Sequence, residues 1–350
     1  MSASEAEADD GAAFRSKLAE YRDLVLPTLM AALPQREPRR HLYDLIGDHF
    51  SRVGKGLRPA LCIATCRAFG GRAEDALKSA AALELLHNAF LVHDDIEDGS
   101  ESRRDQPTMY LQHGLALAVN TGDAMNALSL RLLKDNLPAL GGAKTFRVLQ
   151  EFDHMLIETL EGQAIELGWV RDNDCGVTDG DYLRMVLKKT CWYSFIHPCR
   201  IGALIARGGD VDLERFDRFG FFMGAAFQIQ DDVLNLVGDA RKYGKEIGGD
   251  LWEGKRTLML AHLCSRAGGA ELARVRALLG KPRQQRMRRE IDWFAARLRD
   301  HGSIEFARAA SRDLIAAAAR EFEAAYADAP DGPDKAFVRQ CVEYVVRREL

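Results

Sequence analysis

The chain has 350 residues, enough for one large domain or two ordinary ones. Hydrophobic residues make up 47% of it, which permits a substantial core, and the net charge of -4 argues against a general basic surface for nucleic acid. No apolar run reaches the ~20 residues of a membrane-spanning helix. Residues 1–12 are acidic and lack the regions of a secretory signal, so we expect a disordered tail there and a cytoplasmic protein.

Hydrophobic periodicity predicts helices along the rest of the chain, with almost no alternating strand pattern. The spacing predicts helices over residues 14–33, 41–50, 59–69, 74–98, 114–133, 144–169, 213–237, 258–279, 284–300, 303–327 and 337–350, and a further helix that begins near Thr178. Residues 238–254 are rich in glycine and charge, which indicates a loop or lid. We therefore expect an all-α bundle, with residues 13–350 forming a single domain.

Seven cysteines are scattered through the sequence without a CxxC pair. Cys62 and Cys66 lie one helical turn apart in an apolar segment, which is typical of small core residues. The odd number and the lack of a disulfide framework suit a reducing cytosol.

The apolar helix predicted over residues 74–98 ends in four acidic side chains, at positions 94, 95, 97 and 98. Asp94 and Asp98 are four residues apart, so they project from one helical face about 6 Å apart along the axis. Carboxylates buried at such a helix end are costly without a counter-charge. Magnesium suits them, because it accepts a few carboxylates together with water and substrate phosphates.

The predicted helix over residues 213–237 ends in a similar way. Asp231, Asp232 and Asn235 repeat the acidic pair and the four-residue spacing. One such motif could equally be a solvated helix end. Two of them, each closing an apolar helix, predict acidic ends that face each other across a cavity and hold a magnesium–diphosphate group.

With these two motifs and several further segments, the sequence resembles the trans-isoprenyl diphosphate synthases. These are short-chain prenyltransferases that include farnesyl and geranylgeranyl diphosphate synthases. The matching pieces come in family order between about residues 50 and 260. They are Gly54-Lys55-Gly56-Leu57-Arg58-Pro59, Glu84-Leu85-Leu86-His87, Asp94 to Asp98, Arg103-Arg104, Pro107-Thr108, Lys189-Thr190, Phe227 to Asp232, Gly244-Lys245 and Gly254-Lys255-Arg256-Thr257.

The resemblance implies a helical bundle of the isoprenoid synthase type around a deep central cavity, usually a homodimer, with Mg²⁺ as cofactor. The implied substrates are isopentenyl diphosphate and an allylic diphosphate (dimethylallyl, geranyl or farnesyl). The implied reaction is ionisation, condensation and elimination, with the proton lost to the departed diphosphate because no protein base stands out.

The resemblance also implies roles for individual residues. It implies that isopentenyl diphosphate is bound by Lys55, Arg58, His87 and Arg104. It implies that the allylic diphosphate is bound by Arg103, Lys189, Thr190, Gln228, Lys245 and Lys255. The implied metal ligands are Asp94, Asp95, Asp98, Asp231 and Asp232. The residues closest to the chemistry are Asp94, Asp98, Asp231, Lys189, Thr190 and Gln228, and Gln163 and Glu166 resemble a further polar patch.

The sequence departs from the family pattern at three places. The family usually has Gly-Gly-Lys-Arg in the first loop. Here Val53 stands in place of one Gly and Gly56 in place of the Arg, whereas Lys55 is kept. Asp105 stands where relatives usually carry Gly, and Asn235 stands where many carry the last aspartate of the second motif. We expect Asp105 to point outward, because an anion beside two phosphate-binding arginines would weaken them.

Two other functions use similar residues. A class I terpene cyclase also needs an acidic motif and magnesium, but it has no need for the second phosphate site formed by Lys55, Arg58, His87 and Arg104. A non-catalytic partner subunit of a prenyl synthase tends to lose motif carboxylates, whereas both motifs here keep enough to bind metal.

Product length depends on the residues one turn below Asp94. Ala89 is small, which in relatives often permits products longer than farnesyl, whereas Phe90 is large and could close the pocket. Phe90 could equally be an ordinary aromatic residue of the core. The balance favours geranylgeranyl diphosphate, with farnesyl diphosphate as the alternative.

Overall fold

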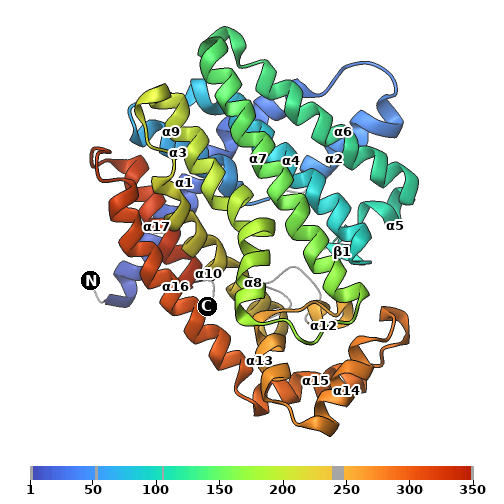
Figure 1. The fold of residues 1–350 in the computed structure, drawn as a ribbon. Helices are drawn as coiled ribbons and strands as arrows, with labels where there is room; N and C mark the ends of the chain where they lie inside the picture. The colour runs from blue at the N-terminus through green and yellow to red at the C-terminus, as the bar shows by residue number, and fades with distance from the viewer. Residues whose placement is uncertain (1–2, 52–53, 105, 239–247, 348–350) are drawn as a thin grey trace.

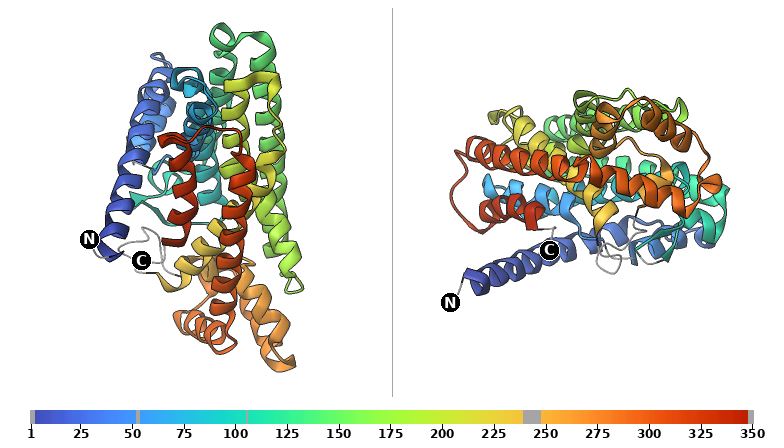
Figure 2. Two further views of the ribbon diagram at one scale, coloured as in Figure 1. Left: turned by 90° about the vertical axis from the view of Figure 1, so that its left-hand side faces the viewer. Right: turned by 90° about the horizontal axis from the view of Figure 1, so that it is seen from below.

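The computed structural model describes residues 3–51, 54–104, 106–238 and 248–347. The described chain is almost entirely helical, as the sequence predicted, and its long helices run in roughly the same direction (Figures 1 and 2). The strands in this part of the chain are β1 (Ser102–Arg103) and β2 (Gln106–Pro107), which pair in antiparallel register. None of the helices described is long and apolar enough to cross a bilayer.

The amino-terminal half supplies α1 (Ala3–Ala32), η1 (Arg39–Tyr43), α2 (Asp44–Ser51), α3 (Leu57–Ala68), α4 (Ala73–Glu97), α5 (Met109–His113), α6 (Leu115–Lys134) and α7 (Leu137–Arg171). Helix α4 lies within the bundle and packs against α1, α3 and α6. Helix α1 begins at Ala3, so the structure has a helix in the stretch where the sequence analysis expected a disordered tail. Alanine and glutamate, which are frequent in this stretch, have high helix propensities.

The carboxy-terminal half supplies α8 (Asp179–Val186), η2 (Leu187–Ile196), α9 (His197–Arg207), η3 (Gly208–Asp210), α10 (Arg215–Val237), α12 (Gly249–Glu253), α13 (Leu258–Arg266), α14 (Gly269–Leu279), η4 (Arg283–Gln285), α15 (Arg288–Asp300), α16 (Ser303–Ala325) and α17 (Pro333–Arg347). Thr178 caps α8 through a reciprocal hydrogen-bond pair with Asp181, as its sequence position suggested. The single helix expected over residues 258–279 is two helices, because the chain leaves the helix at Ala267 and two glycines follow.

Two hydrophobic clusters hold these helices together. One joins α1, α3, α4, α9 and α17, and the other joins α8, α10 and α13 to α16. Helix α10 contributes to both clusters and also packs against η2 and α16. The ends of α4 and α10 that carry the acidic motifs are therefore held by packed helices on each side.

Candidate active site

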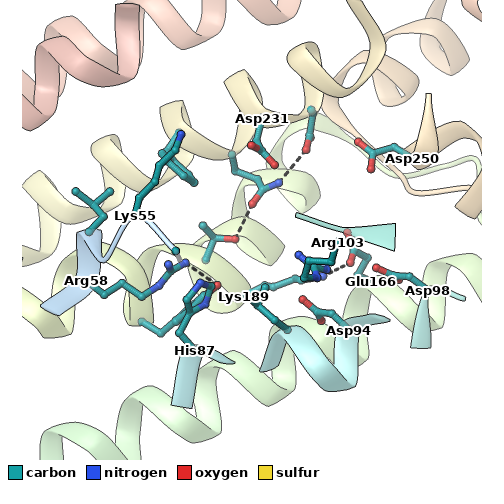
Figure 3. Close-up of a pocket in the computed structure, with 18 of the residues that line it drawn as sticks. Lys55, Arg58, His87, Asp94, Asp98, Arg103, Glu166, Lys189, Asp231 and Asp250 are labelled. Atoms are coloured by element: carbon teal, nitrogen blue, oxygen red, sulfur yellow. Dashed lines mark hydrogen bonds and ion pairs between the residues drawn. The ribbon is translucent and has the colours of Figure 1, made fainter. Parts of the chain in front are cut away.

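A cavity of about 380 Å³ opens between the acidic end of α4 and the acidic end of α10. Its lining also comes from the loop before α3, from α7, α8 and η2, and from the segment that follows α12. Figure 3 shows carboxylates and cations from these elements pointing toward the same space. Residues from most of the segments that matched one family are thus brought together around one cavity.

The first acidic motif divides between two faces of α4. Asp94 and Asp98 line the cavity, and Asp98 lies 2.7 Å from the ammonium group of Lys255. Asp95 is only 3% exposed and is not part of the lining, and it accepts hydrogen bonds of 2.8 and 2.9 Å from Nε of Arg103. The carboxylate of Asp95 therefore holds the guanidinium of Arg103 beside the cavity, and its role as a metal ligand stays a prediction.

The second acidic motif also divides. Asp231 and Asp232 line the cavity, whereas Asn235 is buried beside it and accepts a 3.0 Å hydrogen bond from the backbone N–H of Asp250. Because this hydrogen bond holds the start of α12 in place, the side-chain amide of Asn235 has a structural role. Asp250 is brought to the cavity wall by this contact, and the sequence analysis missed it because α12 lies in a segment read only as a loop.

Two partly buried lysines stand among these carboxylates. Lys189 pairs with Glu166 of α7, and Lys255 pairs with Asp98 and with Glu253 at 3.1 Å. Burial disfavours the charged form of Lys189, but the carboxylates of Glu166 and Asp94 outweigh it and raise the pKa of Lys189. Burial opposes the charge of Lys255 as well, but Asp98 and Glu253 outweigh it and raise the pKa of Lys255, so both lysines are positively charged at neutral pH. Two residues of the sequence analysis, Lys245 and Asp105, lie outside the described residues.

Lys189 and Thr190 lie on η2, a stretch of π-helix. Such stretches inside helices frequently occur at functional sites. Glycines on two neighbouring helices let η2 approach closely: a Cβ at Gly162 of α7 would lie 2.2 Å from the backbone nitrogen of Lys189, and one at Gly224 of α10 would lie 2.6 Å from the sulfur of Cys191. The position of Lys189 thus depends on the absence of these two side chains.

A chain of hydrogen bonds crosses the cavity between η2 and α10. The hydroxyl of Thr190 donates to Oε1 of Gln228 at 2.9 Å, and Nε2 of Gln228 donates to Asp232 at 2.8 Å. The hydroxyl of Tyr182 donates to the other oxygen of Asp232 at 2.7 Å. Burial raises the pKa of Asp232 to about 7 in spite of these hydrogen bonds. These hydrogen bonds fix the orientation of the Thr190 and Gln228 side chains, and both residues line the cavity.

A second group of cations lies on the side of the cavity formed by α3 and α4. Arg58 donates 2.8 Å hydrogen bonds to the hydroxyls of Tyr193 and Ser194, and its guanidinium lies 4.3 Å from the centre of the Tyr193 ring. Lys55 lies over the ring of Tyr344 at 5.6 Å. The carboxy-terminal helix α17 thereby reaches the cavity, which nothing in the sequence motifs indicated.

His87 and Arg104 belong to the same side of the cavity. Burial and the charges of Arg58 and Arg104 lower the pKa of His87 well below its usual range, so the ring is neutral. Its Nδ1 has no hydrogen-bond partner among the described residues. Arg104 adopts a positive φ of 53°, and Gly54 makes room for it, because a Cβ there would lie 2.7 Å from Nη2 of Arg104.

The two candidate chain-length residues lie outside the described cavity lining. Ala89 is 1% exposed within the core, and Phe90 makes an edge-to-face contact with Tyr193 at 5.6 Å. The neighbouring Leu91 and Phe227 supply apolar lining instead. Phe90 therefore stands behind Tyr193, one layer back from the cavity.

The cavity combines paired acidic helix ends, two partly buried lysines and a separate cluster of arginines within one helical bundle. The family model described as polyprenyl synthetase matches residues 39–293. The chain belongs to the polyprenyl synthetase family, whose members are prenyltransferases.

Individual relatives agree with this assignment. The chain is 36% identical over 219 residues to a geranylgeranyl diphosphate synthase of Sulfolobus acidocaldarius, covering 63% of this chain and 66% of that protein, just under two thirds of its length. It is 27% identical to a geranylfarnesyl diphosphate synthase of Natronomonas pharaonis, over 95% of this chain and 97% of that one. The crystal structure of a geranylgeranyl pyrophosphate synthetase from Pyrococcus horikoshii superposes with a TM-score of 0.82 at 28% identity, covering 95% of this chain and 98% of that chain.

Proposed function

We propose that this chain joins isopentenyl diphosphate to an allylic diphosphate and releases a short all-trans prenyl diphosphate, with geranylgeranyl diphosphate as the main product. The observation that carries the proposal is the presence of two separate cationic groups in one cavity. Lys189 and Lys255 lie among the carboxylates, and Lys55, Arg58 and Arg104 lie on the opposite side. A cyclase acting on one prenyl diphosphate has no use for the second group.

The donor set fits magnesium. Asp94, Asp98, Asp231, Asp232 and Asp250 present hard carboxylate oxygens to the cavity. Within the described ranges, no three acidic, histidine or cysteine side chains form a ready-made metal cage. This agrees with an ion that completes its coordination with water and substrate phosphates. When bound, Mg²⁺ would neutralise charge on the leaving diphosphate.

Other residues of the chain bind the allylic diphosphate and stabilise the cation that forms from it. Lys189 and Lys255 hold the allylic diphosphate, and Arg103, oriented by Asp95, faces it from the rim. Thr190 and Gln228 turn neutral dipoles toward the carbon that becomes cationic, which stabilises it without offering a strong nucleophile. Leu91 and Phe227 line the cavity with apolar surface and keep water from the cation. The proton lost at the end passes to the departed diphosphate.

Isopentenyl diphosphate occupies the other cationic group. Arg58 offers a forked donor whose orientation is held by Tyr193 and Ser194. The neutral ring of His87 can donate a hydrogen bond from Nδ1 or Nε2 to a phosphate oxygen. This arrangement places the diphosphate so that the double bond of the same molecule reaches the allylic carbon.

Replacement of Lys55 by alanine tests the second site. We expect Lys55→Ala to raise the KM for isopentenyl diphosphate by about 10- to 100-fold, because one hydrogen bond to a charged group is lost. The KM for the allylic substrate should change little. Lys134→Ala, which removes an exposed lysine at the end of α6, is the control. Equal weakening of both substrates would contradict a dedicated isopentenyl diphosphate site.

Replacement of Phe90 tests the product length. One extra isoprene unit needs roughly one helical turn of depth, ~5.4 Å. If Phe90 supports the floor of the pocket through Tyr193, Phe90→Ala should shift the product toward longer chains at similar turnover, and Phe90→Leu should shift it less. Chromatography of the dephosphorylated products gives the answer. An unchanged product with a lower melting temperature would mean that Phe90 is only a packing residue.

Incubation of the purified protein with isopentenyl diphosphate and each allylic primer in turn tests the function itself. We expect products up to geranylgeranyl diphosphate, and a product that stops at farnesyl would support the alternative. Hydrocarbon released from a single prenyl diphosphate would identify a cyclase. Activity that requires a second protein would identify a partner subunit.

An apolar face on α6 and α7 supports a homodimer. The helices pack against each other on one side of the bundle (Figure 1). Large side chains are left exposed on both, with exposed fractions of 57% at Leu115, 40% at Val119, 62% at Phe146, 50% at Ile157 and 51% at Leu160. A second copy would cover such a surface, and sedimentation of the purified protein measures whether it does. The cytoplasmic location stays a prediction.

A further inference from the structure

A carboxylate lies among the cations of the proposed isopentenyl diphosphate site. Glu84 of α4 lines the cavity on the same side as Lys55, Arg58, His87 and Arg104. It stands three residues before His87, so the two side chains leave α4 on one face. The residue is only 9% exposed. The proposed reaction gives this buried acid no role.

The carboxylate of Glu84 is poorly satisfied by hydrogen bonds. Its Oε1 accepts a hydrogen bond of 3.4 Å from Nδ2 of Asn88, which is longer than the usual range. The same Nδ2 makes a shorter bond of 2.7 Å to the backbone oxygen of Glu84. Oε2 of Glu84 is buried and has no hydrogen-bond partner among the described residues. A charged carboxylate in this setting is unfavourable, and a proton on it removes the charge.

Positive charges around Glu84 act against its burial. Burial raises the pKa of the Glu84 carboxyl group above its usual value, although the positive charges of Arg58 and Arg104 oppose this rise. The charged form of Glu84 therefore depends on the two arginines. Further charged or titratable groups on this side are Arg22 on α1, His49 on α2, Lys55 before α3, His87 on α4 and Tyr193 on η2.

A diphosphate bound by the same two arginines changes this electrostatic setting. Its negative charges offset the positive charges of Arg58 and Arg104 and also lie on the same side of the cavity as the Glu84 carboxylate. Two anions that share a site disfavour each other, and the one that can accept a proton does so more readily. Binding of the diphosphate therefore favours the neutral form of Glu84.

We propose that Glu84 is a residue of the isopentenyl diphosphate site and takes up one proton from solvent when the diphosphate binds. This inference rests on the proposed function, because it takes isopentenyl diphosphate as the ligand of this cationic group. The proton joins a carboxylate oxygen of Glu84, and no other covalent bond forms or breaks. The neutral carboxyl group then no longer repels the diphosphate.

The coupling gives the affinity a definite dependence on pH. The pKa of Glu84 is higher with the diphosphate bound than without it. The favourable contribution is therefore complete below the pKa of the free protein and is lost as the pH rises through the pKa of the complex. Between these two values the dissociation constant for isopentenyl diphosphate increases by up to about tenfold for each pH unit.

Calorimetric titration of the full-length protein with isopentenyl diphosphate tests the coupling. Mg²⁺ is left out, so that the acidic helix ends do not recruit the ligand. Repeating the titration in buffers of different ionisation enthalpy counts the protons taken up. Glu84→Gln keeps the size of the side chain but cannot ionise, and we expect it to take up about one proton fewer per bound ligand than the original chain. At alkaline pH it should also bind isopentenyl diphosphate more tightly than the original chain.

Two further measurements make the outcome decisive. An infrared difference spectrum of the original chain should gain the band of a protonated carboxyl group when isopentenyl diphosphate is added, and this measurement does not depend on the folding of a variant. Glu74→Gln removes an exposed carboxylate from the first turn of the same helix, and it should take up as many protons as the original chain.

Three results would contradict the proposal. Equal proton uptake by the original chain and Glu84→Gln would assign the proton to His87 or to the diphosphate itself. Weaker binding by Glu84→Gln at every pH would mean that a charged carboxylate only orients the arginines. Failure of the original chain to bind isopentenyl diphosphate at all would overturn the proposed function as well, so the two failures are distinguishable.

Discussion

Replacement of either Asp94 or Asp231 by alanine is expected to lower turnover by about 100- to 1,000-fold, the effect of losing one major electrostatic contact to the transition state. Each carboxylate lines the cavity from a different helix, Asp94 from α4 and Asp231 from α10. Neither belongs to the hydrophobic clusters that hold the helices together. The melting temperature should therefore stay close to that of the original protein while product formation is lost.

A surface carboxylate provides the control for this pair. Asp313 is exposed on α16, and Asp313→Asn should leave both turnover and melting temperature unchanged. Turnover measured across a range of Mg²⁺ concentrations separates weakened metal binding from a general defect, because weakened binding is partly rescued by excess metal. Near-original turnover of Asp94→Ala at limiting Mg²⁺ would show that the metal assignment of α4 is wrong.

The second large effect is expected from a single methyl group at Gly162. The added Cβ of Gly162→Ala would lie 2.2 Å from the backbone nitrogen of Lys189 and 2.6 Å from its Cα. Because these are backbone atoms, η2 and α7 must move apart, at a cost of about 1–3 kcal/mol in the free energy of unfolding. The shift also moves Lys189 and Thr190, so turnover should fall by up to about 100-fold.

Gly168 provides a matched control on the same helix. A Cβ at Gly168 meets no atom within 4 Å, so Gly168→Ala should leave turnover unchanged and stabilise α7 by up to about 1 kcal/mol. Thermal unfolding and steady-state kinetics of the two variants measure both effects. Equal behaviour of Gly162→Ala and Gly168→Ala would show that the close approach of α7 does not position Lys189.

Local patterns were enough to predict the helical architecture and to place the acidic pair of the first motif on one helical face. The apolar run before Asp94 predicted a helix over 74–98, and the structure has α4 at Ala73–Glu97. The four-residue spacing of Asp94 and Asp98 placed them on one face, and both line the cavity. These features depend on the period of the helix and on neighbouring residues, which a single sequence displays directly.

The family motifs predicted which cations would meet across the cavity, but not what would hold each of them in place. Arg58 is oriented by Tyr193 and Ser194, and Lys55 lies over Tyr344 from the last helix. These partners come from η2 and α17, far away in the chain. Their identity depends on how the helices pack, which no local pattern encodes.

What the sequence determined by itself was therefore the helices, the two acidic helix ends and the set of cations, because each is a matter of spacing along the chain. Only the tertiary structure decided that Asp95 anchors Arg103 and that Asn235 brings Asp250 to the cavity. Both contacts depend on the direction in which a side chain leaves its element and on what is packed there. Long-range contacts of this kind come from close packing of the whole bundle, in which every neighbour excludes alternative positions.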